Sequence, residues 1–323
     1  MHPLIARIHP AFRTAFLAWL LSRGALWLFL GFGSAAPGEG VLLEGLMRAF
    51  LDYGEAVLPA GPPLAMLWLI PGLLVEGLML LAGLSVYRFA RSTELPQVAE
   101  RACWLWFFSP VMALIATDWS LQMAAALGAI ALGALSSLRP RQSALATGLA
   151  ISARPEFLLF WPLLAYFGWK KYRPGKEPAY TPWLAVLTAP LSFVATIGLT
   201  WSLGGSKHVS FRGLYDESAQ WRTLETLIPA STAEMILFGG VSMALVLGIR
   251  YLGRLPRWYF FATLAAGAIA LLHTPVVPMA VVALAWALPL VVYLGLATDE
   301  PGKERIVLAG FLISYLMLLS QVS

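Results

Sequence analysis

Charged side chains are scarce in this sequence. Of its 323 residues only 12% are Asp, Glu, Lys or Arg, about half the fraction typical of a soluble domain, whereas 59% are hydrophobic. The hydrophobic residues form one long run after another, and an apolar run of about 20 residues is long enough to cross a bilayer. An ordinary soluble globular protein is therefore excluded, and the sequence predicts an integral membrane protein that crosses the bilayer several times.

Cysteine is scarcer still, and the familiar soluble motifs are missing. The single cysteine, Cys103, lies in an apolar run, so the chain cannot form a disulfide framework of its own. The sequence contains no Walker A loop, no glycine-rich nucleotide fingerprint, no H-E-x-x-H and no Cys/His set with metal-ligand spacing. We expect no metal and no cofactor. The net charge of +5 is attributed to basic cytoplasmic loops rather than to nucleic-acid binding.

The apolar runs predict an all-α fold. It is a polytopic membrane helix bundle of about 10–11 segments, with a broken helical hairpin and two sizeable outer loops. Residues 1–323 are expected to form a single integral membrane domain. The candidate segments cover residues 12–34, 64–87, 102–116, 119–137, 142–153, 156–168, 182–203, 234–250, 258–274, 276–296 and 306–322.

Basic residues predict the orientation. Lys and Arg cluster in the loops, and all clusters fall on one side if residues 142–168 enter the membrane and return to the same side. That side is expected to be cytoplasmic, together with the N-terminus. The clusters contain Arg7, Arg13, Arg88, Arg91, Arg101, Arg139, Arg141, Lys170, Lys171, Arg173, Lys176, Arg250, Arg254, Arg257, Lys303 and Arg305.

Residues 142–168 form the predicted broken hairpin. Each arm has about 12 residues, some 18 Å of helix, which is too short to cross an average bilayer. Arg154, Pro155 and Glu156 lie at its apex. Because charge at membrane depth is unfavourable, we expect Arg154 and Glu156 either to face a hydrated cavity or to form a buried pair. The alternative, one long helix kinked at Pro155, would place the flanking basic clusters on opposite sides of the membrane.

Two outer loops differ in charge. Loop 35–63 is acidic, and "EGLMRAFLDYGEAV" can form an amphipathic helix at the membrane surface with Leu46, Phe50 and Val57 on one stripe. Loop 204–232 is basic and aromatic. Either the loops bind each other electrostatically, or they form a site in which one supplies a base and the other holds a phosphate. The cationic candidates are Lys207, His208, Arg212 and Arg222.

Several motifs resemble a known family. The order of "SRGALWLFLG", "FFSPVMALIATDWSLQMAAALGAIALGAL" and "ALATGLAISARPEFLLFWPLL" is similar to that in the GT-C superfamily of membrane glycosyltransferases, in particular the PIG-V-like mannosyltransferases. The resemblance covers residues 15–170. Arg154-Pro155 matches the Arg-Pro element of the family, whereas Thr117-Asp118-Trp119-Ser120 matches its Tyr-Ser-Glu-Ser box only loosely. The late Arg-Tyr pair of the family is absent.

The resemblance implies an activity and a location. Such an enzyme transfers a sugar, mannose in PIG-V-like members, from a polyprenyl-phosphate donor to an acceptor at the outer face of the membrane. The chain would be a multi-pass protein of the bacterial inner membrane. Arg154 and the cationic residues of loop 204–232 would bind the donor phosphate.

The catalytic base is less well matched. The family uses an Asp in the first outer loop, and alignment on Asp52-Tyr53-Gly54 places Leu43 at that position, with Glu44 next to it. Glu44 either replaces the Asp or is a surface carboxylate of a protein that has lost the chemistry. Asp52 and Asp118 are the next candidates for the base.

Two other classes of function compete with a glycosyltransferase. A non-catalytic GT-C-like accessory or scaffold subunit would bind partner membrane subunits and lipid. A transporter would be expected to contain interrupted helices in matching halves, and the single interrupted hairpin argues against it.

Overall fold

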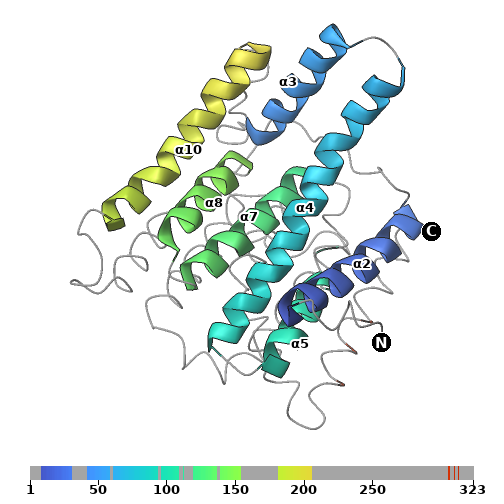
Figure 1. Cartoon of the computed structure of the whole chain (residues 1–323), viewed down its shortest axis with the longest axis vertical. Coiled ribbons are helices and arrows are strands. Elements are labelled where there is room, and N and C mark those ends of the chain that lie inside the picture. Colours follow the sequence, from blue (N-terminus) through green and yellow to red (C-terminus); the bar gives the residue numbers. More distant parts are fainter. Residues whose placement is uncertain are drawn as a thin grey trace, which may run out of the picture. The chain divides into compact units, whose positions relative to one another are not determined.

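A computed structural model describes residues 9–30, 42–58, 61–93, 96–108, 112, 119–136, 139–153, 181–205, 305, 309 and 312. Within these residues all regular secondary structure is helical, with no strand, as the all-α prediction requires. The helices are α2 (Pro10–Leu30), α3 (Leu42–Val57), α4 (Pro62–Thr93), α5 (Pro96–Phe107), α7 (Trp119–Ser136), α8 (Pro140–Ala153) and α10 (Thr181–Gly204) (Figure 1).

Most of these helices coincide with predicted segments. Helices α2, α4, α7, α8 and α10 occupy the predicted runs to within a few residues, whereas α5 begins earlier than the predicted segment 102–116. Proline marks several helix starts: Pro10, Pro62, Pro96 and Pro140 are first residues of helices. Its fixed φ and its missing N–H are compatible with the first turn, so these starts are locally encoded. The remaining predicted segments lie outside the described residues, apart from positions 309 and 312 of segment 306–322, which are helical.

The chain divides into two compact units, and α4 contributes to both. Unit 1 contains α2, the part of α4 from Gly83 onward, and α5. Its core combines small side chains such as Ala15 with the large buried rings of Trp106 and Phe107. A Cβ atom at Gly83 would collide with the ring of Phe107. The Cys103 thiol donates a hydrogen bond to the Gly83 carbonyl at 3.6 Å. The missing side chain at Gly83 therefore allows α4 and α5 to pack closely.

Unit 2 contains α3, the part of α4 up to Ala82, α7, α8 and α10. Helix α8 packs against both α7 and α10, and α3 packs against α10, α8 and α7. The Ser143 hydroxyl donates to the Ala131 carbonyl at 2.7 Å, which joins α8 to α7. A Cβ atom at Gly148 would collide with Ser192 Oγ and with the Ala189 carbonyl. Helices α8 and α10 therefore approach as closely as small residues allow, a common feature of membrane helix pairs.

Helix α10 buries its polar side chains and exposes its large apolar ones, the reverse of a helix on the surface of a soluble protein. Ser192, Thr196 and Thr200 are buried. Their hydroxyls are satisfied locally: Thr196 donates to the Ser192 carbonyl at 2.8 Å and Thr200 to the Thr196 carbonyl at 2.7 Å. A soluble amphipathic helix buries its apolar stripe instead. Here the large apolar side chains are exposed, namely Leu187, Leu191, Val194, Leu199 and Trp201.

Among the described residues, two helical stretches are long and apolar enough to cross a membrane. Leu69–Arg91 of α4 has 23 residues and Leu187–Gly204 of α10 has 18 residues. At 1.5 Å per residue they measure about 35 Å and about 27 Å, against a hydrocarbon core of about 30 Å. The exposed apolar face of α10 is typical of contact with lipid, so two described helices agree with the prediction of a membrane protein.

Candidate functional site

Helix α3 forms within residues 35–63, the predicted first outer loop, as the amphipathic pattern predicts. It has two apolar stripes rather than one. Met47 and Leu51 are buried in unit 2, whereas the predicted stripe of Leu46, Phe50 and Val57 lies about 100° away around the helix axis, with Phe50 and Val57 exposed. The packing of α3 against α10 and α8 therefore uses the stripe that the sequence did not single out.

Two of the three candidate bases belong to α3. Glu44 lies in its first turn, and Asp52 lies about two turns further along with an exposed side chain. The side chain of Glu44 lies outside the described residues. Arg48 is four residues from each of them, and residues at this spacing are neighbours on a helix surface. A carboxylate in the first turn is also stabilised by the helix dipole.

Helices α7 and α8 form an antiparallel hairpin. The hydrogen bond from Ser143 to Ala131 joins the beginning of α8 to the end of α7, and the Arg139 amide donates to the Ala134 carbonyl at 2.9 Å in the turn. The first residue of α7 and the last residue of α8 therefore lie at the same end of the hairpin (Figure 1). The first residue of α7, Trp119, directly follows Asp118 in the sequence, and the last residue of α8, Ala153, directly precedes Arg154.

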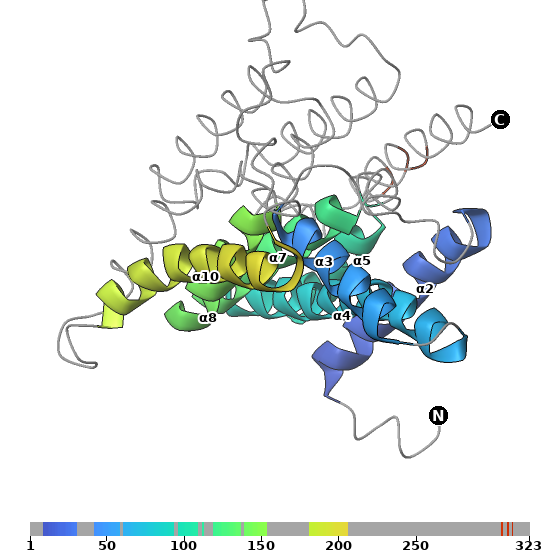
Figure 2. The ribbon, with the colours of Figure 1, turned by 90° about the horizontal axis from the view of Figure 1, so that it is seen from above.

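The start of α3 lies at this same end of the hairpin. Figures 1 and 2 show its N-terminal end beside the C-terminal end of α8, and α3 packs against both α7 and α8. Three helix ends that contain or adjoin Glu44, Asp118 and Arg154 are thus brought together within unit 2. Helix ends far apart in the sequence lie together here because the hairpin returns the chain to the level of α3.

The other candidates lie outside the described residues. Asp118 and Arg154 do, and so do the cationic residues of loop 204–232, which are Lys207, His208, Arg212 and Arg222. The chain enters that loop from the end of α10. Gly205 has a φ of 71°, in the left-handed region, and its amide donates to the Trp201 carbonyl at 2.8 Å. Glycine favours this conformation and ends the helix. Helix α10 packs against α3.

The two ends of unit 2 carry different exposed charges. Arg139 and Arg141 are exposed at the turn between α7 and α8. Asp52 and Glu55 are exposed on α3, which packs near the opposite end of the hairpin. In the orientation predicted from the sequence, the turn is on the cytoplasmic side and the loop that contains α3 is on the outer side.

One polar residue was not singled out from the sequence. Arg23, in the middle of α2, is 4% exposed and is the only buried charged residue in the described part of the chain. A charge inside a predicted membrane segment is itself a signal of a functional or structural role, and Arg23 lies within the apolar run 12–34. Across the described ranges, no group of three or more His, Cys, Asp or Glu residues could hold a metal ion.

No known protein family, curated protein or solved structure gives a significant match to this chain. The assignment of a function therefore depends on the motifs in the sequence and on the arrangement of helices in unit 2.

Proposed function

We propose that this chain is a membrane glycosyltransferase with a GT-C-like bundle of about 10–11 segments, in the bacterial inner membrane with a cytoplasmic N-terminus. It would transfer a sugar from a polyprenyl-phosphate donor to an acceptor at the outer face. The observation that carries the proposal is the meeting of three helix ends in unit 2. One contains Glu44, one follows Asp118 and one precedes Arg154.

The chemistry requires a base and a cation on opposite sides of the anomeric carbon. The acceptor hydroxyl attacks this carbon while the Glu44 carboxylate accepts the hydroxyl proton. The bond between the anomeric carbon and the phosphate oxygen breaks, and its electron pair leaves with the polyprenyl phosphate. Arg154 would stabilise that phosphate, because a guanidinium stays charged and can bind two of its oxygens. Cationic side chains of loop 204–232 would complete the phosphate site.

The geometry of unit 2 supports Glu44 ahead of the other candidates on α3. The N-terminal end of α3 lies beside the helix end that leads to Arg154. Asp52 lies further along α3 and is exposed. A base and a phosphate-binding arginine must act on the same sugar, so the residue nearer the end of α8 is the better candidate. Asp118, just before α7, is the third candidate, as its helix end lies at the same level.

The alternative is a non-catalytic accessory or scaffold subunit on the same architecture. Leu43 occupies the position of the family's catalytic Asp, which favours this alternative. A second observation also favours it: Phe50, Tyr53 and Val57 form an exposed apolar stripe on α3. A partner membrane subunit could cover such a stripe.

The decisive measurement is transfer by the purified full-length protein in nanodiscs, with radiolabelled polyprenyl-phosphate mannose or glucose as donor. Glu44→Gln keeps the size of the side chain and removes its basicity, so transfer should fall by at least about 100-fold while donor binding remains. Arg154→Ala should weaken donor binding. Glu55→Gln on α3 and Arg141→Gln at the opposite end of the hairpin are matched controls that should leave transfer unchanged.

Other results would favour the alternative. Full activity of Glu44→Gln would assign the base to Asp52 or Asp118. If the wild-type protein transfers no sugar from either donor and instead copurifies with a membrane protein that does, the accessory subunit replaces the enzyme.

A further inference from the structure

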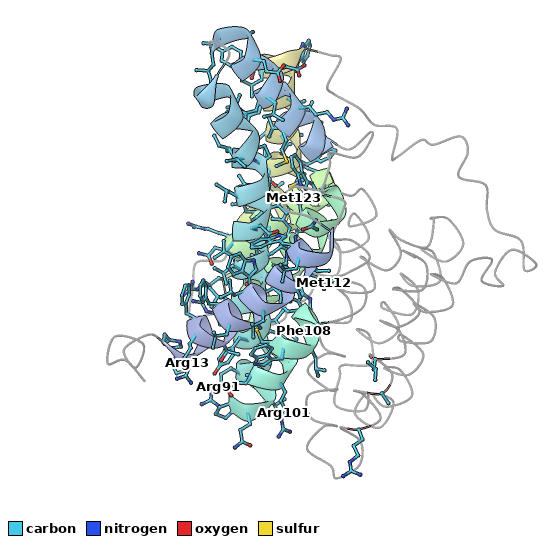
Figure 3. All side chains as sticks on the ribbon, turned by 90° about the vertical axis from the view of Figure 1, so that its right-hand side faces the viewer. Arg13, Arg91, Arg101, Phe108, Met112 and Met123 are labelled. Carbon is cyan, nitrogen blue, oxygen red and sulfur yellow. The ribbon has the colours of Figure 1, made fainter. Side chains whose placement is uncertain are left out.

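Three helices of unit 1 bring arginines to one end of that unit. Arg13 lies in the first turn of α2, Arg91 in the last turn of α4, and Arg101 in α5. Figure 3 shows the three side chains at the same end. The hydroxyl of Tyr87, a residue only 6% exposed, lies within electrostatic range of Arg13, Arg91 and Glu100. The cluster is therefore a three-dimensional feature and not a run of basic residues in the sequence.

The charge of this cluster is strongly positive. Arg88 lies one turn before Arg91 on α4 and is exposed like Arg91, so the three helices contribute four arginines here. Glu100 is the one described carboxylate within electrostatic range of Tyr87. Like charges brought together from separate helices repel one another. An anion bound among them would offset this repulsion and would accept charge-assisted hydrogen bonds from the guanidinium groups.

The position of the cluster identifies the type of anion. The apolar stretch of α4 that is long enough to cross a membrane ends at Arg91. If this stretch spans the bilayer, Arg91 is placed at the depth of the lipid headgroups. On α2, Phe16, Leu17 and Leu20 follow Arg13 by three, four and seven residues and therefore share its face. Their side chains are 37%, 42% and 40% exposed. An apolar track thus runs directly from the cationic cluster.

A phospholipid has a headgroup phosphate and apolar acyl chains. The cationic cluster matches the phosphate, and the apolar track beside it matches an acyl chain. We propose that the cluster of Arg13, Arg91 and Tyr87 binds the headgroup phosphate of an anionic phospholipid of the cytoplasmic leaflet. One acyl chain would lie along Phe16 and Leu20. The lipid would stabilise unit 1 by neutralising the cluster. This site is separate from the proposed sugar-transfer site and does not depend on transferase activity.

The test measures lipid retention by the full-length protein. The protein is purified in mild detergent, incubated with dioleoylphosphatidylglycerol or dioleoylphosphatidylcholine, and examined by native mass spectrometry. We expect the wild type to retain one phosphatidylglycerol in preference to phosphatidylcholine. Arg13→Gln and Arg91→Gln should each weaken retention about fivefold, since one arginine near an anionic lipid surface contributes a factor of this size. Tyr87→Phe gives a second, conservative variant of the same site.

Matched controls separate this site from general attraction to anionic lipid. Arg139→Gln and Arg141→Gln remove the same charge from the turn between α7 and α8, and they should leave the retained phosphatidylglycerol in place. Equal loss in these controls, equal retention of both lipids, or full displacement by inorganic phosphate would overturn the proposal. Circular dichroism of each variant shows that a lost lipid does not follow from unfolding. Transfer activity is measured separately, so failure here leaves the proposed function untouched.

Discussion

Substituting Gly148 by Ala tests how closely α8 and α10 pack. A Cβ atom at this position would overlap Ser192 Oγ and the backbone carbonyl of Ala189. The serine can rotate away, but the carbonyl belongs to the α10 backbone, so the two helices must move apart. Overpacking of this kind destabilises a protein by about 1–3 kcal/mol. Alanine in place of glycine stabilises a helix by about 1 kcal/mol. We therefore expect a net loss of up to about 2 kcal/mol.

Two other glycines of unit 2 provide matched controls. A Cβ atom at Gly198 of α10 would have nothing within 4 Å, so Gly198→Ala should be neutral or stabilise by up to about 1 kcal/mol. A Cβ atom at Gly54 would meet only the end of the Leu67 side chain, which can rotate, so Gly54→Ala should fall between the two.

Thermal unfolding of the detergent-purified protein, followed by circular dichroism, measures this order. Each 1 kcal/mol corresponds to roughly 2–4 °C in Tm for a domain of about 150–250 residues. We expect the highest Tm for Gly198→Ala, an intermediate Tm for Gly54→Ala and the lowest Tm for Gly148→Ala. A Gly148→Ala protein that melts at or above the wild-type temperature would refute the close approach of α8 and α10.

Three further substitutions test other contacts. Gly83→Ala should displace the neighbouring aromatic ring and speed alkylation of buried Cys103 by a maleimide, and an unchanged rate would contradict the packing of unit 1. Ser143→Ala removes the hydroxyl that donates to the Ala131 carbonyl, so the folded protein should lose about 1 kcal/mol of stability in the same melts. An unchanged Tm would argue against this hydrogen bond. Leu191→Arg should disfavour insertion by about 2.5–3.5 kcal/mol if its exposed side chain meets lipid, and lower the yield in the membrane fraction. The same change on a water-facing surface would be nearly neutral, so an unchanged yield would contradict the lipid contact.

Much of the secondary structure could be predicted from the sequence. The apolar runs predict α2, α4, α7, α8 and α10, and proline at the first position marks several of their starts. The helix in the first outer loop was also predicted, because an apolar stripe recurs there at helical spacing. The early start of α5 at Pro96 was missed, since its first turns are more polar than the run that follows.

The candidate site was predicted only in part. The sequence contained the motif around Arg154 and the acidic loop 35–63. These features predicted Arg154 as a phosphate ligand and Glu44 or Asp52 as a base. The sequence did not show that the start of α3 lies beside the end of α8, because Leu42 and Ala153 are 111 positions apart in the chain. Nor did it distinguish Arg23, which is buried, from exposed arginines such as Arg88 and Arg91 by anything other than its place in an apolar run.

The sequence by itself determined where the described helices form and which stretches are apolar enough for lipid, because both depend on local composition and on the spacing of side chains along one helix. Only the tertiary structure decided which face of each helix is buried. Helix α3 buries Met47 and Leu51 and exposes Phe50, and α10 buries Thr196 and exposes Leu191. The choice depends on the neighbouring helices: Gly148 permits a close approach that places the hydroxyl face of α10 inward. Such a contact joins residues distant in the sequence, and no local pattern encodes it.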